Sequence, residues 1–158
     1  MLLAILVAAG AVALDQISKL LVLRYLAPVG SYPLWRGVLH FTYVENRGAA
    51  FGTLSEHRWV FLAASTAAIL AIGVYLFRAR PKSVLERLSL AMIAGGGIGN
   101  MIDRVARGYV VDFIDVTCIR FYVFNIADSF VCVGCGLMIL YLIRAEVRDR
   151  RAAKEKRS

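Results

Sequence analysis

The chain has 158 residues, of which 59% are hydrophobic and 19% are charged, and its mean hydropathy is +0.66. This apolar content excludes an ordinary soluble domain and is typical of membrane proteins, and the length indicates one domain over residues 1–158. The net charge is +8, and residues 144–158 alone hold seven Lys or Arg against three acids. A basic tail directly after an apolar segment predicts a cytoplasmic anchor on anionic lipid in preference to a nucleic-acid-binding segment.

Four apolar segments follow one another along the chain, at residues 2–26, 59–77, 88–102 and 121–143. At about 1.5 Å per helical residue, about 20 residues cross a hydrocarbon core of roughly 30 Å. The third segment is short, so we extend it at the water interface and expect a span over about 85–104. These segments predict an integral membrane α-helical protein with four transmembrane helices.

The first segment has an alternative interpretation as a cleaved leader, because Ala11-Val12-Ala13 follows an apolar run as a signal-peptide cleavage site does. However, no positive residue precedes that run, and apolar sequence resumes after Lys19. We therefore expect the first segment to be retained as a membrane span.

Lys and Arg are distributed unequally between the segments that connect the spans. Residues 78–87 and the tail 144–158 together carry eleven, whereas residues 27–58 and 103–121 carry six. The positive-inside rule then places the 78–87 connection and both termini in the cytoplasm. Residues 27–58 and 103–121 are expected to face outward.

The first outward segment is more than a linker. Residues 34–44 are rich in aromatic and β-branched side chains, which predicts one or two strands turning near Gly37. Trp35, Phe41 and Tyr43 suit the membrane–water interface. We expect a small sheet that rests on the outer leaflet.

Three cysteines give no disulfide framework. Cys132 and Cys135 form a C-x-x-C inside the fourth apolar segment, with no further thiol or histidine nearby. We interpret this pair as buried structural residues, and Cys118 as a free thiol between spans.

The glycine-rich run at residues 95–100 lacks the Lys-Ser/Thr of a phosphate-binding loop, so we interpret its glycines as points of close helix approach. The sequence has no H-E-x-x-H, which argues against a metalloprotease, and no serine paired with a histidine on a span. Carboxylates are the groups that remain for chemistry, and we expect no metal and no cofactor.

Asp112 and Asp128 lie in or next to apolar segments, where an ionised carboxylate is energetically unfavourable. Asp128 lies within the apolar run 121–143, about two turns into the expected last helix, and Asp112 ends a short apolar stretch before it. Both approach the outward membrane face. Two close carboxylates can share one proton, because both cannot easily ionise, and such a pair can activate water. A polar clamp between segments is the alternative.

Further polar residues recur at helical spacing within the apolar segments. They are Asp15 and Lys19 on the first, Asn100, Asp103 and Arg104 on the third, and Asn125 with Asp128 on the fourth. In lipid such groups must point at one another or into a wet cavity. Structural clamps and an active site both satisfy that requirement.

Two other classes of protein also place ionisable residues inside a membrane. An ion or proton transporter would need a relay between the two faces, whereas these acids gather near one face. A non-catalytic scaffold subunit would lose assembly, and not turnover, when either aspartate is removed.

Five sequence blocks together resemble a known family. They are DQISK at residues 15–19, NRGAAF at 46–51, GGGIGNMIDR at 95–104, GYVVDF at 108–113 and FNIAD at 124–128. Their order and content are similar to those of the bacterial lipoprotein signal peptidases (signal peptidase II). Ser18 stands where the family often has Thr, which keeps the hydroxyl.

The resemblance implies a membrane aspartic endopeptidase with four helices and a small periplasmic β-cradle, located in the inner membrane with its site facing the periplasm. Its substrate would be a prolipoprotein carrying diacylglycerol on a cysteine, and the cut would fall just before that cysteine. Cyclic peptides such as globomycin are expected to inhibit it. We expect a monomer in membrane lipid that binds no nucleic acid.

Carried onto this chain, the resemblance implies a catalytic dyad of Asp112 and Asp128. The residues expected to shape or support the site are Asp15, Lys19, Asn46, Gly48, Asn100, Asp103, Arg104, Asn125 and Ala127. One aspartate would take a proton from water while the other, protonated, would bind the scissile carbonyl. The sequence does not assign the proton to either one, since such a pair titrates as a unit.

Overall fold

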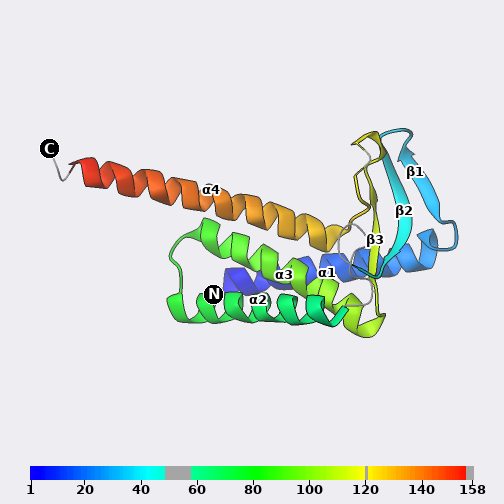
Figure 1. Cartoon of the computed structure of the whole chain (residues 1–158), viewed down its shortest axis with the longest axis horizontal. Coiled ribbons are helices and arrows are strands. Elements are labelled where there is room, and N and C mark those ends of the chain that lie inside the picture. The colour runs from blue at the N-terminus through cyan, green and yellow to red at the C-terminus, as the bar shows by residue number, and fades with distance from the viewer. Residues whose placement is uncertain (49–57, 120, 156–158) are drawn as a thin grey trace.

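The computed structural model describes residues 1–48, 58–119 and 121–155. The elements in chain order are α1 (Leu2–Leu21), a π-helical turn (Val22–Leu26), β1 (Ser31–Trp35), β2 (Leu39–Asn46), α2 (Arg58–Ala79), α3 (Val84–Ala106), β3 (Val110–Asp115), a 3-10 turn (Thr117–Ile119) and α4 (Ile126–Glu155). The sheet lies at one end of the helices, whereas both termini and the α2–α3 connection lie toward the other end (Figure 1).

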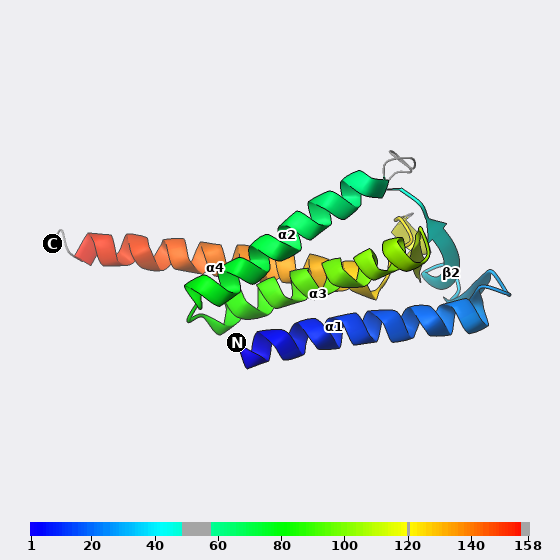
Figure 2. The ribbon, with the colours of Figure 1, turned by 90° about the horizontal axis from the view of Figure 1, so that it is seen from below.

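Helix α3 is the centre of the helical part, because it packs against α1, α2 and α4 (Figure 2). Its glycines permit this packing. A Cβ at Gly96 would overlap the Ala127 carbonyl of α4, and one at Gly99 would lie 2.5 Å from Asp15 Oδ2 of α1. The interpretation of the glycine run as a site of close helix approach is therefore confirmed.

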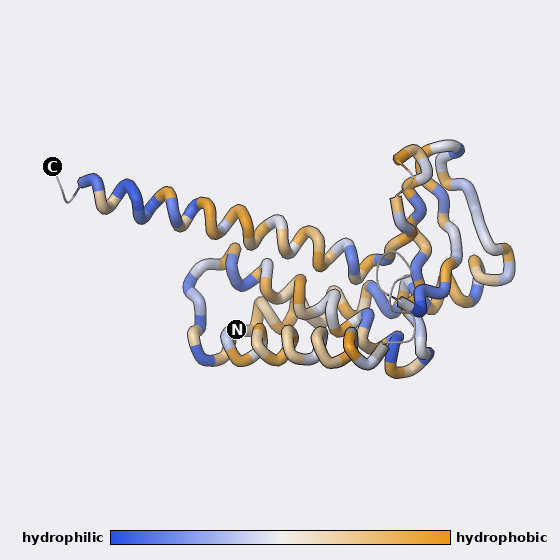
Figure 3. Tube along the Cα trace, in the orientation of Figure 1, coloured by the Kyte–Doolittle hydropathy of each residue, from blue (hydrophilic) through white to orange (hydrophobic). Residues whose placement is uncertain are grey.

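Three helices in the described part of the chain are long and apolar enough to cross a membrane, over Leu2–Leu26, Leu62–Ala79 and Ile126–Glu155. Only 6 to 22% of these windows is buried inside the protein, so most of their apolar surface faces outward (Figure 3). Helix α3 has 23 residues but is less apolar, because it carries glycines and charged residues toward its neighbours. The count of four spans stays a prediction.

The start of the fourth helix differs from the sequence expectation. Helix α4 begins at Ile126, and the preceding Phe124 instead forms a β-bridge with Ile114 of β3. Asp128 therefore lies in the first turn of α4, and its expected position two turns into the helix is wrong. Two contacts have this effect: the bridge to Ile114 keeps Phe124 extended, and Asn125 accepts a hydrogen bond from the Asp128 N–H and so begins the helix at this point.

The three strands form one antiparallel sheet in the order β1-β2-β3. The expected strand pair turning near Gly37 is confirmed, and Gly37 has a φ of +76°, which favours glycine. Strand β3 was not expected, because its short apolar sequence lacks a clear alternation. It is held by pairing with β2 and by an edge-to-face contact between Phe41 and Phe113, with ring centres 6.1 Å apart.

The cysteines are all free thiols, as expected for Cys118. The interpretation of Cys132 and Cys135 as buried is wrong, because both are exposed on the surface of α4. They lie on the part of α4 that turns away from α3, while Gly134 between them contacts the α3 backbone.

Candidate active site

Backbone pairing between β3 and the residues just before α4 brings the two aspartates together. The Ile114 N–H donates to the Phe124 carbonyl over 2.7 Å, and the Phe124 N–H donates back over 3.0 Å. Asp112 lies two residues before Ile114 and is only 2% exposed. The first turn of α4, with Asp128, is therefore fixed beside the middle of β3.

Asn125 joins both aspartates through its side chain. Its Oδ1 accepts from the Asp128 N–H over 2.9 Å, and Asp128 Oδ2 accepts from the Asn125 N–H over 3.2 Å. This reciprocal arrangement is a capping box at the start of α4. The Asn125 Nδ2 also donates to Asp112 Oδ1 over 2.7 Å. One buried amide thus sets the positions of both carboxylates.

Asn100 of α3 supports Asp128 from the opposite side. Its Nδ2 donates to Asp128 Oδ1 over 2.7 Å. Its Oδ1 accepts from Lys19 Nζ over 2.9 Å and from Asn125 Nδ2 over 3.0 Å. Because a cation can only donate, the contact with Lys19 fixes the amide so that its NH₂ group faces Asp128.

Lys19 is the centre of a buried charge network below the aspartates. It lies 2.9 Å from Asp15 and 2.9 Å from Asp103, and all three side chains are fully buried. Asp15 also accepts from the Ala127 N–H over 3.0 Å, and Asp103 from the Val111 N–H over 3.1 Å. The network therefore ties α1 and α3 to the two segments that carry Asp112 and Asp128.

Strand β2 supplies the second donor to Asp112. Asn46 Nδ2 donates to Asp112 Oδ2 over 2.9 Å, and Asn46 Oδ1 accepts from the Gly48 N–H over 3.1 Å. The predicted residues Asn46 and Gly48 therefore lie at the site. Residues 49–51 of that sequence block lie outside the described residues.

Arg104 is the cation nearest the aspartates on α3. It is partly buried, donates to the Asn100 carbonyl over 3.4 Å, and interacts electrostatically with Asp112, Asp128 and Asp103. The neighbouring Asp103 forms its ion pairs with Lys19 and with Arg107, at 2.9 and 2.6 Å. Every predicted site residue is thus in or beside one connected polar cluster.

Burial is the main cause that raises the pKa of Asp112 from 3.8 to about 6. The charge of Asp128 raises the pKa further, while the hydrogen bonds from Asn46 and Asn125 lower it. The two aspartates are therefore electrostatically coupled. Asp112 therefore keeps its proton to a higher pH than an ordinary aspartate does.

Two residues of the cluster were not singled out from the sequence as site residues. Gln16 Nε2 donates to Asp15 over 3.1 Å and to Asp103 over 3.3 Å, and Arg107 forms the ion pair with Asp103. The i, i+4 spacing of Asp103 and Arg107 is a signal that could have identified Arg107. Gln16 has no comparable spacing to a charged partner, and only its place in the DQISK block at residues 15–19 could have identified it.

A sequence model of the family described as "Signal peptidase (SPase) II" matches residues 7–144. The chain belongs to the signal peptidase II family. The lipoprotein signal peptidase of Caldanaerobacter subterraneus subsp. tengcongensis is 47% identical over 142 residues, covering 89% of this chain and 94% of the relative. That of Clostridioides difficile strain 630 is 43% identical over 139 residues, covering 88% and 93%.

Solved structures agree with this membership of the signal peptidase II family. A bacterial membrane enzyme solved by the in meso method at 2.3 Å resolution has a TM-score of 0.82 and 31% identity, covering 91% of this chain and 89% of the other. A second, at 1.9 Å, has a TM-score of 0.82 and 30% identity, covering 90% and 93%. The chain is therefore a peptidase by family, and its fold is that of bacterial membrane enzymes.

Proposed function

We propose that this chain is an aspartic endopeptidase that removes the signal peptide from diacylglyceryl-modified prolipoproteins, cutting just before the lipidated cysteine. The observation that carries the proposal is the pair Asp112 and Asp128, linked through the one Asn125 side chain in a buried polar cluster. The names of the relatives, which are lipoprotein signal peptidases, support the substrate class.

The environments of the two aspartates favour different roles. Asp112 has a raised pKa, which favours it as the carboxyl that holds the proton and donates a hydrogen bond to the scissile carbonyl. Asp128 receives donors on both oxygens, from Asn100 and from the Asn125 N–H, and lies at the N-terminus of α4, where negative charge is stabilised. Asp128 is therefore the base that takes a proton from water.

The two aspartates together supply and accept the protons that the hydrolysis requires. Water attacks the scissile carbonyl carbon while Asp128 accepts its proton and Asp112 donates its proton to the carbonyl oxygen. Collapse of the tetrahedral intermediate expels the amine, which takes the proton held by Asp128, while a hydroxyl of the intermediate returns a proton to Asp112 as the carbonyl re-forms. The new carboxyl terminus leaves with the signal peptide, and one proton remains on the dyad.

The arrangement of the helices supports an orientation in the bacterial inner membrane. The sheet and the dyad share one end, which we assign to the periplasmic side. Both termini and the α2–α3 connection share the other, more basic end, which we assign to the cytoplasm. In this proposal four helices span the membrane, the protein is a monomer, and globomycin-like cyclic peptides occupy the dyad.

The test is cleavage of a diacylglyceryl-modified prolipoprotein by the purified protein, with wild type beside Asp112→Asn and Asp128→Asn. We expect cleavage before the lipidated cysteine, its block by globomycin, and its loss in both variants while both still accumulate in the membrane. Substantial cleavage by either variant would overturn the dyad. No cleavage by a folded wild type would favour transport or scaffolding, which ion flux in liposomes would then separate.

A further inference from the structure

Helix α4 is longer than a membrane crossing requires. It is one helix of 30 residues, or about 45 Å, against a hydrocarbon core of roughly 30 Å. Its last part, residues 144–155, is polar and extends past the other helices (Figures 1 and 3). The match to the signal peptidase II family covers residues 7–144, so residues 145–155 of this extension lie outside the matched part.

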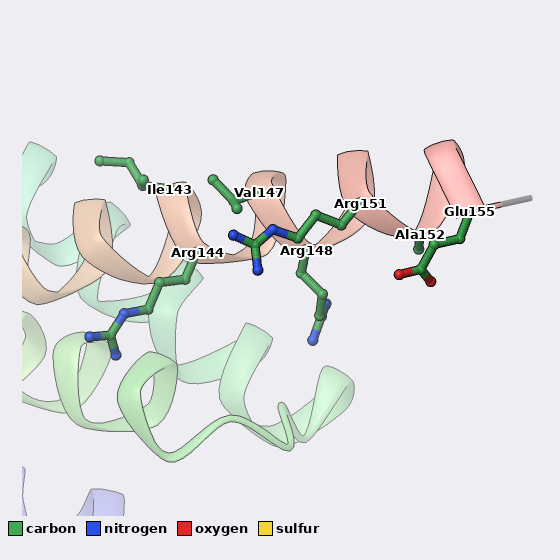
Figure 4. A pocket seen from close by; sticks show the side chains of 7 residues that line it. All are labelled: Ile143, Arg144, Val147, Arg148, Arg151, Ala152 and Glu155. Carbon is green, nitrogen blue, oxygen red and sulfur yellow. The ribbon is translucent and has the colours of Figure 1, made fainter. Parts of the chain in front are cut away.

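One side of the extension carries an arginine face, formed by Arg144, Arg148 and Arg151. These residues are spaced i, i+4 and i+7, so they lie on one side of the helix. They line an open groove of about 450 Å³ together with the apolar side chains of Ile143 and Val147 (Figure 4). Glu155 is the acid that lines the groove, at the end farthest from the membrane span. The face therefore combines positive charge with apolar surface near the span.

The cations of this face are largely uncompensated. Arg150, on another side of the helix, is paired with Glu146 at 2.6 Å. Arg148 reaches Asp149 only at 3.4 Å, and both side chains are at least 70% exposed, so that pair is weak. Within the residues that the structure describes, Arg144 and Arg151 form no ion pair. Two guanidinium groups are thus available to an external anion.

The position of the arginine face matches the headgroup layer of a bilayer. Arg144 and Arg148 lie within about 8 Å of Ile143 along the helix, and the polar layer on each side of the core is about 5–8 Å thick. The long side chain of Arg151 can reach back toward the same layer. Arg78, Arg80 and Lys82, all exposed, lie in the last turn of α2 or in the α2–α3 connection, which is at the same end of the molecule (Figure 1), and they add positive charge there.

We propose that the arginine face binds the phosphate-bearing headgroups of anionic phospholipids at the level where α4 leaves the hydrocarbon core. Guanidinium groups bind phosphate through paired hydrogen bonds, and a phosphatidylglycerol headgroup presents one phosphate with acyl chains beside it. Those acyl chains suit Ile143 and Val147. A nucleic acid would suit this face less well, because it begins at the end of a membrane span and has no aromatic side chain for base stacking.

The test compares two double variants of the full-length protein that remove the same charge from the same helix. Arg144→Gln with Arg151→Gln removes the two unpaired cations of the face. Arg150→Gln with Lys154→Gln is the matched control, because neither residue lines the groove. Each protein is incubated with mixed vesicles of phosphatidylglycerol and phosphatidylcholine, repurified, and analysed for retained lipid by mass spectrometry.

We expect wild type and control to retain phosphatidylglycerol in preference to phosphatidylcholine. The Arg144/Arg151 variant should lose that preference by about tenfold, and the wild-type preference should weaken at high salt. Equal loss in both variants, or no preference in wild type, would overturn the proposal. Displacement of the lipid by inorganic phosphate alone, or tighter binding of a labelled RNA at the same face, would also overturn it.

Two controls separate this result from other effects. Equal thermal unfolding of the three proteins in detergent shows that the variants are folded. Lipid retention is measured without any cleavage, so the proposed peptidase activity can fail while this proposal stands, or the reverse. Retained preference in a folded Arg144/Arg151 variant would count against the face in either case.

Discussion

Asn125 donates a buried hydrogen bond of 2.7 Å to the Asp112 carboxylate while it caps the helix that carries Asp128. A single side chain thus connects strand β3 with helix α4. Each part of its amide has a different task, because Oδ1 caps the helix and Nδ2 contacts Asp112 and Asn100. The two tasks can be separated by mutation.

Asn125→Ser keeps an oxygen that can cap α4 but removes the amide that donates to both Asp112 and Asn100. We expect the free energy of unfolding to fall by about 1–3 kcal/mol, because a buried donor to Asp112 is lost while the cap is kept, and kcat to fall by about 10- to 100-fold. Prolipoprotein cleavage and thermal unfolding measure the two quantities. Asn125→Ala should lower both, since it removes cap and donor together. Full activity in the serine variant would contradict a role for the amide in positioning Asp112.

Lys19→Met leaves the fully buried carboxylates of Asp15 and Asp103 without their shared cation. Removing one partner of a buried ion pair costs about 3–5 kcal/mol, so we expect a large fall in Tm and little protein in the membrane. Adding Asp15→Asn or Asp103→Asn should restore part of the loss, because the buried charge is then reduced. A double-mutant cycle on Tm tests this coupling. Additive losses would mean that Lys19 does not stabilise the protein through these acids.

The raised pKa of Asp112, about 6, predicts how cleavage depends on pH. If Asp112 must carry a proton, kcat/KM falls as pH rises through about 6, since Asp112 then ionises. For the same reason the contribution of Asp112 to folding stability is lost between about pH 4 and 6 as pH rises.

The hydrogen bond from Asn46 lowers the pKa of Asp112, so Asn46→Leu should move this fall in kcat/KM to higher pH. Glu45→Gln, at an exposed neighbouring position, is the matched control and should leave the profile in place. The measurement is kcat/KM across the pH range for all three proteins. A shift to lower pH in Asn46→Leu would reject the assigned proton.

Gly99→Ala places a methyl group 2.5 Å from Asp15 Oδ2 and 3.1 Å from Asp15 Cγ. Because Asp15 is held by Lys19 and the Ala127 N–H, it cannot move aside, and we expect a loss of about 1–3 kcal/mol in unfolding free energy. Gly136→Ala is the control on α4, where a Cβ meets nothing within 4 Å. Thermal unfolding in detergent compares the two. Equal Tm values for Gly99→Ala and Gly136→Ala would show that α1 and α3 are packed less tightly at Gly99 than the 2.5 Å approach to Asp15 indicates.

Much of the fold and of the site could be predicted from the sequence. Apolar runs marked all four helices, and the strand pair around Gly37 followed from its aromatic and β-branched residues. The ion pair between Asp15 and Lys19 followed from their i, i+4 spacing. Such features depend on neighbours in the chain, so a local pattern is sufficient to reveal them.

Other features depended on contacts between distant segments. Because Phe124 pairs with Ile114, α4 begins only at Ile126. The uninterrupted apolar run in the sequence therefore could not predict that Asp128 lies in the first turn of the helix. The outward position of Cys132 depends on which side of α4 meets α3. An apolar residue is equally compatible with the protein interior and with lipid, so hydropathy does not separate the two.

The sequence by itself determined which chemical groups this protein has, because costly carboxylates such as Asp112 and Asp128 stand out within apolar segments. Only the tertiary structure decided how they differ. Burial raises the pKa of Asp112, whose carboxylate accepts hydrogen bonds from Asn46 and Asn125. Asp128 instead accepts a hydrogen bond on each carboxylate oxygen, from Asn100 and from the Asn125 N–H. Those partners lie up to 66 positions from the aspartate that they contact, and only folding sets their distances and hence the electrostatics of the pair.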